Sequence, residues 1–313
     1  MMNTTKILPV LFRSTLVLAI GLVAATATAG PFGKIVSFGD SLADTGNMFA
    51  NSGGLVPPAD TYHDGRMSNG IIWVEYLAGD LGVAIDDYAY FGAKTDDTNF
   101  RDDDLPFYLI GFRDQVDMYL ADLDGEKVDN RDLITVVIGA NDFLTYLIKG
   151  GDLPIPGSIQ NTLTELGRLL DAGARHIVIW NVPDLSGTPA FAGLSDLEKI
   201  GLSQLLATYN AMLADGLAQL SANYNCNIVV ADAYGTLNAI ISDPAAYGLE
   251  NVTVPASMDP SKDPAVSLFW DGVHPTTVGH RIVADAVLDA MLEHYVPGEA
   301  IGLDGNVPGW ARR

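Results

Sequence analysis

Short runs of β-branched residues alternate along this chain with longer segments of helical periodicity. The runs are, in order, Lys34–Phe38, Asp87–Tyr90, Leu133–Ile138, His176–Trp180 and Asn227–Ala231. The helices that we expect between and after them are Asn69–Leu81, Phe112–Leu123, Ser158–Ala172, Ser195–Asn223 and Thr277–Tyr295. This alternation is typical of a parallel sheet with helices on both faces. We therefore expect one α/β domain built around a sheet of about five strands.

Two long segments follow neither pattern. Asn51–Met67 is rich in Gly, Pro and Asn, and Pro244–Pro264 is rich in Pro. Both are predicted to be loops over a binding site. Between Asp96 and Asp104 the chain also gathers five aspartates, whose oxygens are ligands that calcium accepts. Their spacing does not match the EF-hand loop, so we interpret them as part of a solvated loop.

The first 29 residues have the features of a cleavable secretory signal peptide. Lys6 and Arg13 flank the start of an apolar stretch, Thr15–Ala25, and small residues follow it up to Ala29. A membrane anchor is the alternative, but the apolar stretch is shorter than the roughly 20 residues that span a bilayer. We therefore expect cleavage after Ala29 and export to the periplasm or the medium.

The remainder is expected to form one domain over residues 30–296, followed by an extension over residues 297–313. No comparable apolar run occurs after residue 29, so we expect no membrane span. Cleavage removes two of the 17 basic residues and none of the 39 acidic ones, which moves the formal net charge from −22 to −24. Such a chain is not expected to bind nucleic acid or an anionic bilayer. The charge fits a saline habitat or simply solubility after export.

Candidate functional residues follow the predicted strands, at the edge where an open parallel sheet binds its ligands. Ser41, Gly92 and Asn141 follow the first three strands, and Asp271 and His274 lie together before the last helix. A serine hydroxyl needs an imidazole to take its proton and a carboxylate to orient that imidazole. Asp271 and His274 provide both groups from one turn, so Ser41 is a candidate nucleophile.

Attack of a serine on an acyl carbon creates an oxyanion, and each donor aimed at it can contribute about 3 to 4 kcal/mol. The candidate donors are the backbone N–H groups of Ser41 and Gly92 and the side-chain amide of Asn141. Each residue also has a plain structural interpretation: a helix cap at Ser41, a turn at Gly92 and the start of a helix at Asn141. Their order at successive strand ends favours the chemical interpretation.

The motifs around these residues resemble those of the GDSL/SGNH hydrolase family, in particular the branch with lipases, phospholipases and thermolabile-haemolysin-like proteins. The matching blocks are Phe38–Asn47, Gly65–Gly70, Asp87–Ala93, Gly139–Asp142 and Asp271–Thr276. The resemblance covers nearly the whole chain after the signal peptide. It implies the SGNH hydrolase fold, which is a flavodoxin-like, three-layer α/β/α sandwich.

The resemblance also implies roles for individual residues. Ser41, Asp271 and His274 would form the catalytic triad, and Ser41, Gly92 and Asn141 the oxyanion hole. Phe91 departs from the family pattern, because related sequences often have a small residue before this glycine. The aromatic ring either narrows the acyl side of the pocket or only packs.

The function implied by the resemblance is that of a secreted esterase or lipase, with phospholipids among its candidate substrates and without a cofactor or a metal. An acyltransferase that passes the acyl group to an alcohol stays open as an alternative. A non-catalytic binding protein is less favoured. A flavin carrier is also less favoured, because the first loop has an aspartate where a phosphate cradle needs glycines, hydroxyls or basic groups. The sequence predicts neither the acyl length, the head group nor the oligomeric state. The apolar run Phe107–Ile110 lines an acyl groove or opens a helix.

The remaining histidines and the single cysteine have plainer interpretations. Four histidines have no triad partner in the sequence and are interpreted as surface or packing residues: His63, His176, His280 and His294. A zinc site made by His274, His280 and an aspartate would disable the triad. Cys226 excludes an intramolecular disulfide and is interpreted as an inert thiol at the start of a strand.

Overall fold

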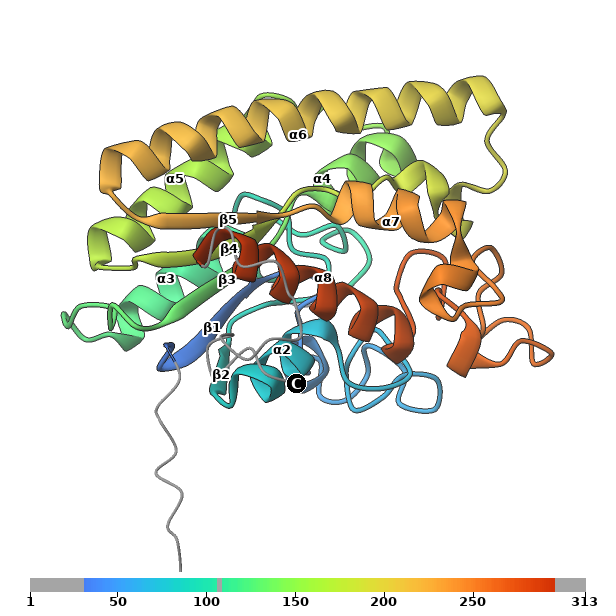
Figure 1. The fold of residues 1–313 in the computed structure, drawn as a ribbon, viewed down its shortest axis with the longest axis horizontal. Helices are drawn as coiled ribbons and strands as arrows, with labels where there is room; N and C mark the ends of the chain where they lie inside the picture. Colours follow the sequence, from blue (N-terminus) through green and yellow to red (C-terminus); the bar gives the residue numbers. More distant parts are fainter. Residues whose placement is uncertain (1–30, 106–108, 296–313) are drawn as a thin grey trace, which may run out of the picture.

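The computed structural model describes residues 31–105 and 109–295. Within them, five parallel strands form one sheet in the order β2-β1-β3-β4-β5 (Figure 1). The strands are β1 (Lys34–Gly39), β2 (Ala84–Asp87), β3 (Leu133–Val137), β4 (His176–Trp180) and β5 (Asn227–Ala231). This order is that of a doubly wound, flavodoxin-like sheet. The predicted fold class is therefore confirmed.

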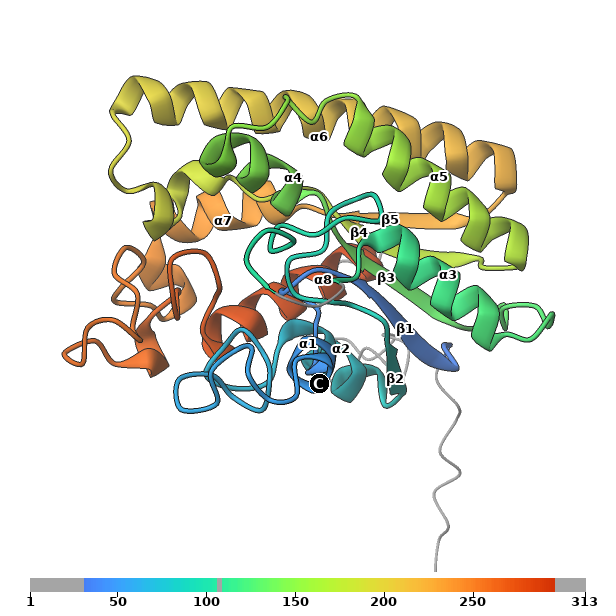
Figure 2. The same ribbon diagram turned by 180° about the vertical axis from the view of Figure 1, so that it is seen from behind.

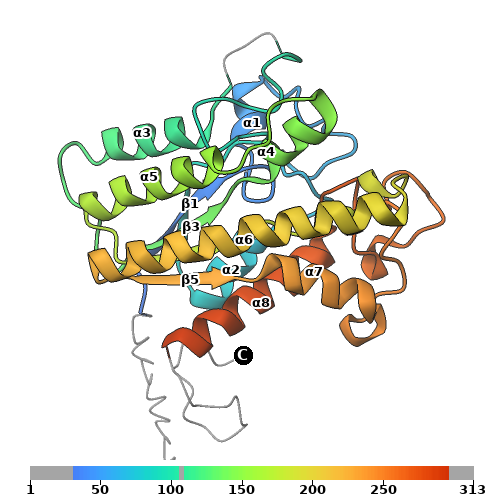
Figure 3. The same cartoon turned by 90° about the horizontal axis from the view of Figure 1, so that it is seen from above.

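Helices cover both faces of the sheet, and shorter helices lie beyond its carboxyl edge. On one face are α3 (Phe112–Asp122), α5 (Gly157–Ala172) and α6 (Asp196–Tyr224), and on the other are α2 (Trp73–Leu81) and α8 (Thr277–Tyr295) (Figures 1 and 2). Figure 3 looks down on the layer of α3, α5 and α6. The short helices are α1 (Asn47–Asn51), α4 (Ala140–Leu144) and α7 (Ala233–Ser242). A π-helical turn lies at Thr145–Lys149, and 3₁₀ turns lie at Leu185–Gly187, Pro189–Phe191, Pro244–Tyr247 and Pro264–Val266.

Alternate residues of each strand point into two separate cores, as the period of two in a strand requires. On β1, Val36 and Phe38 join the core under α3, α5 and α6, whereas Ile35 joins the core under α2 and α8. All five residues of the central strand β3 are buried. The edge strand β2 is exposed at alternate positions. The hydrophobic run of β3 thus marks a strand that is covered on both faces.

The second strand lies earlier than predicted, at Ala84–Asp87 instead of Asp87–Tyr90. The N–H groups of Tyr88 and Tyr90 still donate to β1. The carbonyls of Asp87 and Ala89, however, accept hydrogen bonds from the side-chain amide of Asn47, at 2.9 and 3.0 Å. The prediction was wrong because a side chain replaces part of the backbone ladder.

The first long helix was also predicted too early, from Asn69. It begins at Trp73, because the side-chain oxygen of Asn69 accepts the N–H of Thr277 at 2.8 Å. The carboxylate of Glu75 then caps the new start by accepting the N–H of Ile72 at 2.9 Å. The other predicted strands and helices agree with the structure to within about one residue at each end.

The two long loops have different positions. Among the described residues, none of Pro244–Pro264 lines the cavity described below. Leu249 of this segment instead packs behind the cavity wall, against Ile240 and Leu268. The prediction that it covers the site is therefore wrong. Asn51–Met67, by contrast, reaches the site.

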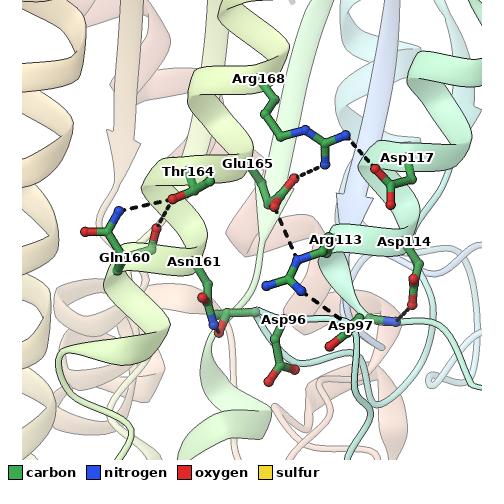
Figure 4. Close-up of polar contacts among 12 residues, drawn as sticks. Asp96, Asp97, Arg113, Asp114, Asp117, Gln160, Asn161, Thr164, Glu165 and Arg168 are labelled. Carbon is green, nitrogen blue, oxygen red and sulfur yellow. Dashed lines mark hydrogen bonds and ion pairs between the residues drawn. The ribbon is translucent and has the colours of Figure 1, made fainter.

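Ion pairs join α3 to α5 and support the segment before α3 (Figure 4). The side chain of Glu165 on α5 is 4% exposed and accepts a hydrogen bond from Arg168 at 2.6 Å. Arg113 on α3 lies 3.7 Å from the other Glu165 oxygen and 3.5 Å from Asp97. Arg168 also pairs with Asp117 at 2.5 Å. A nearly buried carboxylate between two guanidinium groups therefore fixes α3 beside α5.

Some predictions concern residues outside the described ranges: the signal peptide at 1–29, the extension at 297–313, and Phe107 and Tyr108. Within residues 31–105 and 109–295, no helix is both long enough and apolar enough to cross a bilayer. In the aspartate-rich loop, Asp103 and Asp104 lie 3.5 and 3.7 Å from the ammonium of Lys149. The described part of the chain contains no group of three His, Cys, Asp or Glu side chains that could hold a metal ion.

Candidate active site

Strand β1 brings Ser41 to the carboxyl edge of the sheet. Gly39 has a φ of 143°, and a Cβ atom there would lie 2.2 Å from the carbonyl oxygen of Val137. The N–H of Asp40 donates to that carbonyl at 3.0 Å. The Asp40 carboxylate then accepts the N–H of Leu42 at 3.0 Å, so the chain turns sharply around Ser41. Close backbone packing therefore explains why glycine precedes the Asp-Ser pair.

Ser41, His274 and Asp271 form one hydrogen-bonded line. Ser41 Oγ lies 2.8 Å from His274 Nε2, and His274 Nδ1 lies 2.9 and 2.8 Å from the two carboxylate oxygens of Asp271. All three residues are buried, with 6 to 7% of their surface exposed. The structure thus brings together the three residues that the sequence analysis grouped.

The electrostatics of this line depend on the pairing of His274 with Asp271. Burial alone would lower the pKa of His274, but the nearby Asp271 carboxylate raises it above the ordinary value of 6.5. Burial alone would raise the pKa of Asp271, but His274 and two backbone N–H groups hold it well below its usual range. Asp271 is therefore ionised, and its charge favours the protonated imidazole.

Gly92 lies in the loop after β2, and Asn141 lies at the start of α4, after β3. Gly92 has a φ of 80°, and a Cβ atom there would lie 2.3 Å from the side-chain oxygen of Asn99. Asn141, in the first turn of α4, has its side-chain nitrogen 3.1 Å from the carbonyl of Ala93 and 3.3 Å from Asp40. Within the described residues, the N–H groups of Ser41 and Gly92 donate to no protein acceptor. Asn141 thus contacts Asp40, next to the serine, and lines the same cavity as Ser41.

Buried carboxylates hold the loops that carry Ser41 and Gly92. Asp44 accepts four backbone N–H groups, including those of Met48 and of Phe91, next to Gly92, at 3.1 and 2.8 Å. Asp87 accepts the N–H and the hydroxyl of Thr45, both at 2.7 Å. Burial raises the pKa of Asp44, and burial together with the charge of Asp44 raises that of Asp87. This pair fixes the Ser41 loop against the Gly92 loop.

Asp142 makes a third such connection, beside Asn141. It accepts the N–H and the hydroxyl of Thr95 at 3.1 and 2.7 Å, and the amide of Asn161 on α5 donates to that hydroxyl at 3.3 Å. Burial raises the pKa of Asp142 to about 6, and that of Asp40 to about 7. The loops that carry Ser41, Gly92 and Asn141 are therefore held together by side chains from three strand ends and from α5.

A cavity of about 290 Å³ opens beside Ser41 and His274. Its walls are mainly apolar and come from several elements, among them Leu42, Phe91, Leu144, Trp180, Leu237 and Ile240. Its far side is built by α7 and α8, which pack on each other. Such a space accepts an apolar ligand and leaves its reactive end beside the serine.

Two features of this site were not predicted from the sequence. The walls from α7 were missed because that helix was not predicted, although Asp232 caps it by accepting the N–H of Gly235. The second feature is Tyr62, whose hydroxyl donates to Asp271 at 2.7 Å. Its position shortly before the Gly65–Gly70 block was the only sign in the sequence that this tyrosine lies near the site. A contact over 209 positions has no local signature.

Other residues singled out in the sequence lie elsewhere or only pack. The Phe91 ring lies against His274, with ring centroids 6.3 Å apart, and also lines the cavity. Leu109 is buried but is not among the cavity walls. His280 is completely buried, and burial lowers its pKa to about 3. Cys226 is a free thiol at the amino end of β5, where burial raises its pKa. Neither residue belongs to the site.

This arrangement can perform acyl chemistry. The imidazole nitrogen that faces Ser41 is within the distance needed to accept its proton. The carboxylate of Asp271 can stabilise the resulting imidazolium. The backbone N–H groups of Ser41 and Gly92 can donate to an oxyanion, whereas the Asn141 amide would first exchange a contact with Ala93 or Asp40. The apolar cavity can hold the group attached to the acyl carbon.

Comparison with known proteins gives the same picture. The sequence profile of the family described as GDSL-like lipase/acylhydrolase matches residues 35–287. The chain is 28% identical to the thermolabile hemolysin of Vibrio parahaemolyticus over 82% of its own length and 63% of the hemolysin. It is 28% identical to the phosphatidylcholine-sterol acyltransferase of Aeromonas hydrophila, over 88% of this chain and 96% of that protein.

A third relative is the secreted effector protein SseJ of Salmonella typhimurium, with 28% identity over 85% of this chain and 65% of the effector. The matches therefore span less than two thirds of the hemolysin and of the effector but nearly all of the acyltransferase. The profile match runs from β1 into α8 and includes Ser41, Gly92, Asn141, Asp271 and His274. The chain belongs to the GDSL-like lipase/acylhydrolase family of ester-bond hydrolases.

Proposed function

We propose that this protein hydrolyses carboxylic esters through an acyl-serine intermediate. Ser41 Oγ attacks the ester carbonyl and passes its proton to His274, which then protonates the leaving alcohol. The oxyanion accepts hydrogen bonds from the N–H groups of Ser41 and Gly92 and from the Asn141 amide. Water, activated by His274, then releases the acid. Asp271 stabilises the imidazolium in both steps.

One observation carries this proposal: the hydrogen-bonded residues Ser41, His274 and Asp271 lie together in the wall of an apolar cavity. The hydrogen bonds support the assignment of Ser41 as nucleophile and His274 as its base. The apolar cavity supports binding of the acyl group. No cofactor enters the proposed steps. A small-molecule or lipid ester is the proposed substrate.

The cavity supports an acyl chain of several carbons rather than an acetyl group. Its volume of about 290 Å³ equals roughly ten water-sized groups. A flexible aliphatic chain gains affinity from such walls because it leaves water, at about 0.8 kcal/mol for each buried methylene. We therefore place fatty acyl esters, phospholipids included, ahead of acetyl esters.

Replacement of Ser41 by alanine tests the nucleophile. Ser41→Ala should reduce turnover of p-nitrophenyl esters by about 10³-fold or more, and a fluorophosphonate should label the wild type but not the variant. Ser261→Ala, at an exposed position, is the matched control and should behave as the wild type. Retained turnover in Ser41→Ala would contradict the assignment. A folded wild type that is not labelled would favour a non-catalytic binding protein.

A series of p-nitrophenyl esters tests the cavity. We expect kcat/KM to rise from the acetyl ester to esters of medium chain length. Leu237→Trp, which fills cavity space from α7, should lower kcat/KM for the longer esters and spare the acetyl ester. Leu197→Trp places the same side chain at a position that is 79% exposed and should leave the profile unchanged. Equal effects of the two variants would exclude the cavity as the acyl site.

Acyl transfer to an alcohol is the second candidate function. It is favoured by the relative named phosphatidylcholine-sterol acyltransferase, of which the match covers 96%. The two reactions share the acyl-serine and differ in the acceptor that resolves it. Product analysis of phosphatidylcholine turnover, with and without an added sterol, distinguishes them: sterol ester identifies transfer, and free fatty acid alone identifies hydrolysis.

We also propose that the protein is exported. The proposal is supported by the signal-peptide pattern of residues 1–29 and by a relative that is named a secreted effector. Expression of the full chain in a bacterial host, followed by N-terminal sequencing of the exported form, tests it. Cleavage after Ala29 is expected, and retention of Lys6 in the mature protein would contradict it.

A further inference from the structure

One block of the sequence that resembles the family motifs, Gly65–Gly70, has no part in the steps proposed above. It belongs to a segment that begins at Pro58 and runs beside the Asp271–His274 turn. Within this segment, Tyr62 is half-buried and its hydroxyl donates to Oδ2 of Asp271 at 2.7 Å. The proposed base is thus contacted, through its carboxylate partner, by a residue 209 positions earlier in the chain.

The two oxygens of Asp271 are held in different ways. Oδ1 accepts the backbone N–H groups of Val273 and His274, at 3.0 and 2.8 Å, so the turn itself fixes this oxygen. The imidazole contacts both oxygens, Oδ1 at 2.9 Å and Oδ2 at 2.8 Å, but only Oδ2 also accepts the hydroxyl of Tyr62. Tyr62 therefore supplies the second point that fixes the plane of the carboxylate.

The segment that carries Tyr62 is attached to the residues that follow His274. Ser68 Oγ donates to the carbonyl of Pro275 at 2.9 Å, and the side-chain oxygen of Asn69 accepts the N–H of Thr277 at 2.8 Å. Arg66 makes two hydrogen bonds to Glu75 on α2, at 3.1 and 2.7 Å. Residues 66–69 thus connect α2 to residues 275–277, which follow His274, and set the position of Tyr62.

We propose that Tyr62 is a positioning residue of the ester hydrolase: its hydroxyl holds the Asp271 carboxylate so that Nε2 of His274 faces Ser41. The inference rests on the proposed function. In this role Tyr62 touches neither substrate nor serine and acts only through Asp271. The Gly65–Gly70 block then has a purpose, since it anchors the loop that presents this hydroxyl.

The chemistry of the contact gives the direction of its effects. Burial and the charge of Asp271 both raise the pKa of Tyr62, so the phenol remains a neutral donor at working pH. A donor on Oδ2 disperses the carboxylate charge and opposes its rotation. Loss of the hydroxyl frees the carboxylate to turn and leaves a more basic oxygen beside the imidazole.

The pKa of His274 should therefore rise when the hydroxyl is removed. The other charged or titratable groups that face His274 are Asp271, Asp40 after β1 and His280 on α8. A substitution at Tyr62 leaves Asp40 and His280 unchanged and alters only Asp271. A shift in the acid limb of the pH profile would thus report the missing hydroxyl.

The test is Tyr62→Phe in the full-length protein, with Tyr76→Phe as the matched control. Tyr76 is also partly buried and its hydroxyl bonds to Thr277 at 2.9 Å, near the histidine but away from Asp271. We expect Tyr62→Phe to lower kcat on a p-nitrophenyl ester by about tenfold with little change in KM. The acid limb of kcat/KM should move to higher pH. Tyr76→Phe should change neither.

A double-mutant cycle separates positioning from a general structural effect. In an Asp271→Ala background, Tyr62→Phe should cause no further loss, measured as the rate of fluorophosphonate labelling of Ser41. An equal loss in both backgrounds, or unchanged kcat in Tyr62→Phe, would overturn the proposal. Circular dichroism at the assay temperature checks that each variant is folded. Failure of the proposed function is recognised separately, because Ser41→Ala would then keep its turnover.

Discussion

Two flanks of the site bury aspartates in different ways. The nucleophile flank, comprising residues 40–47, 87–99 and 141–142, contains Asp40, Asp44, Asp87 and Asp142, all with raised pKa values because of burial. The base flank, residues 268–277, contains Asp271, whose pKa is lowered. Burial would raise the pKa on both flanks. The charge of the partner decides the difference.

On the nucleophile flank the partners are backbone N–H groups, hydroxyls and amides, which orient loops without a full positive charge. On the base flank the partner is an imidazole that can become a cation. The first arrangement is suited to holding a shape, and the second to storing and returning a proton. We therefore expect variants of the nucleophile flank to lose stability first and variants of the base flank to lose activity first.

The largest effect should come from the base flank. Asp271→Asn keeps the shape of the side chain but removes the charge that stabilises the imidazolium, and it allows the wrong histidine tautomer. We expect kcat to fall about 10³- to 10⁴-fold. Steady-state kinetics measure this, with thermal unfolding to verify a folded variant. A fall of less than tenfold would remove the distinction between the flanks.

On the nucleophile flank, Asp44→Asn turns an amide group toward backbone N–H groups that need an acceptor. We expect a loss of about 2 to 3 kcal/mol in the free energy of unfolding, with a smaller fractional change in kcat than in Asp271→Asn. Urea denaturation provides the measurement. Asp60→Asn, at an exposed position, is the control and should change stability very little. A stable Asp44→Asn variant would show that the N–H groups find water instead.

The same flank should make stability depend on pH. A carboxyl whose pKa is higher in the folded than in the unfolded protein binds its proton more tightly when folded, so stability falls as pH rises from about 4 to about 7. Asp87→Asn should flatten this slope by about 1 to 2 kcal/mol across that window, whereas Asp60→Asn should not. Melting temperatures at constant ionic strength measure the slope. Parallel curves for both variants would contradict the assignment.

The smallest effect concerns the pH dependence of activity. His274 must be neutral to accept the proton of Ser41, and Asp271 raises its pKa above 6.5. We therefore expect the acid limb of kcat/KM to have an apparent pKa above 6.5. Rates over pH 5 to 9 determine it. A limb below 6.5 would mean that burial outweighs the Asp271 charge.

Much of the fold was predictable because local pattern and burial coincide. Leu133–Val137 is hydrophobic throughout and forms the central strand, and Gly92 has a positive φ and closely approaches Asn99 in the same loop. The turn from Asp271 to His274 is also local, and its Nδ1 contact lies within one sequence block. These features need no knowledge of distant partners.

The features that escaped prediction depend on contacts far apart in sequence. The side chain of Asn47 bonds the Asp87 carbonyl where β2 ends. The contact between Asn69 and Thr277 accounts for the late start of α2. The cavity wall at Leu237 depends on how α7 meets α8. Tyr62 looks like any loop tyrosine until the fold brings it to Asp271. Periodicity carries no information about such pairs.

The distance between Ser41 and His274 along the chain has a consequence for biosynthesis. The two residues are 233 positions apart, and His274 sits just before α8, which packs on α2. During synthesis, Ser41 therefore emerges from the ribosome long before His274. Because the proposed reaction needs both groups, the nascent chain gains this activity only after the final helix has docked on α2.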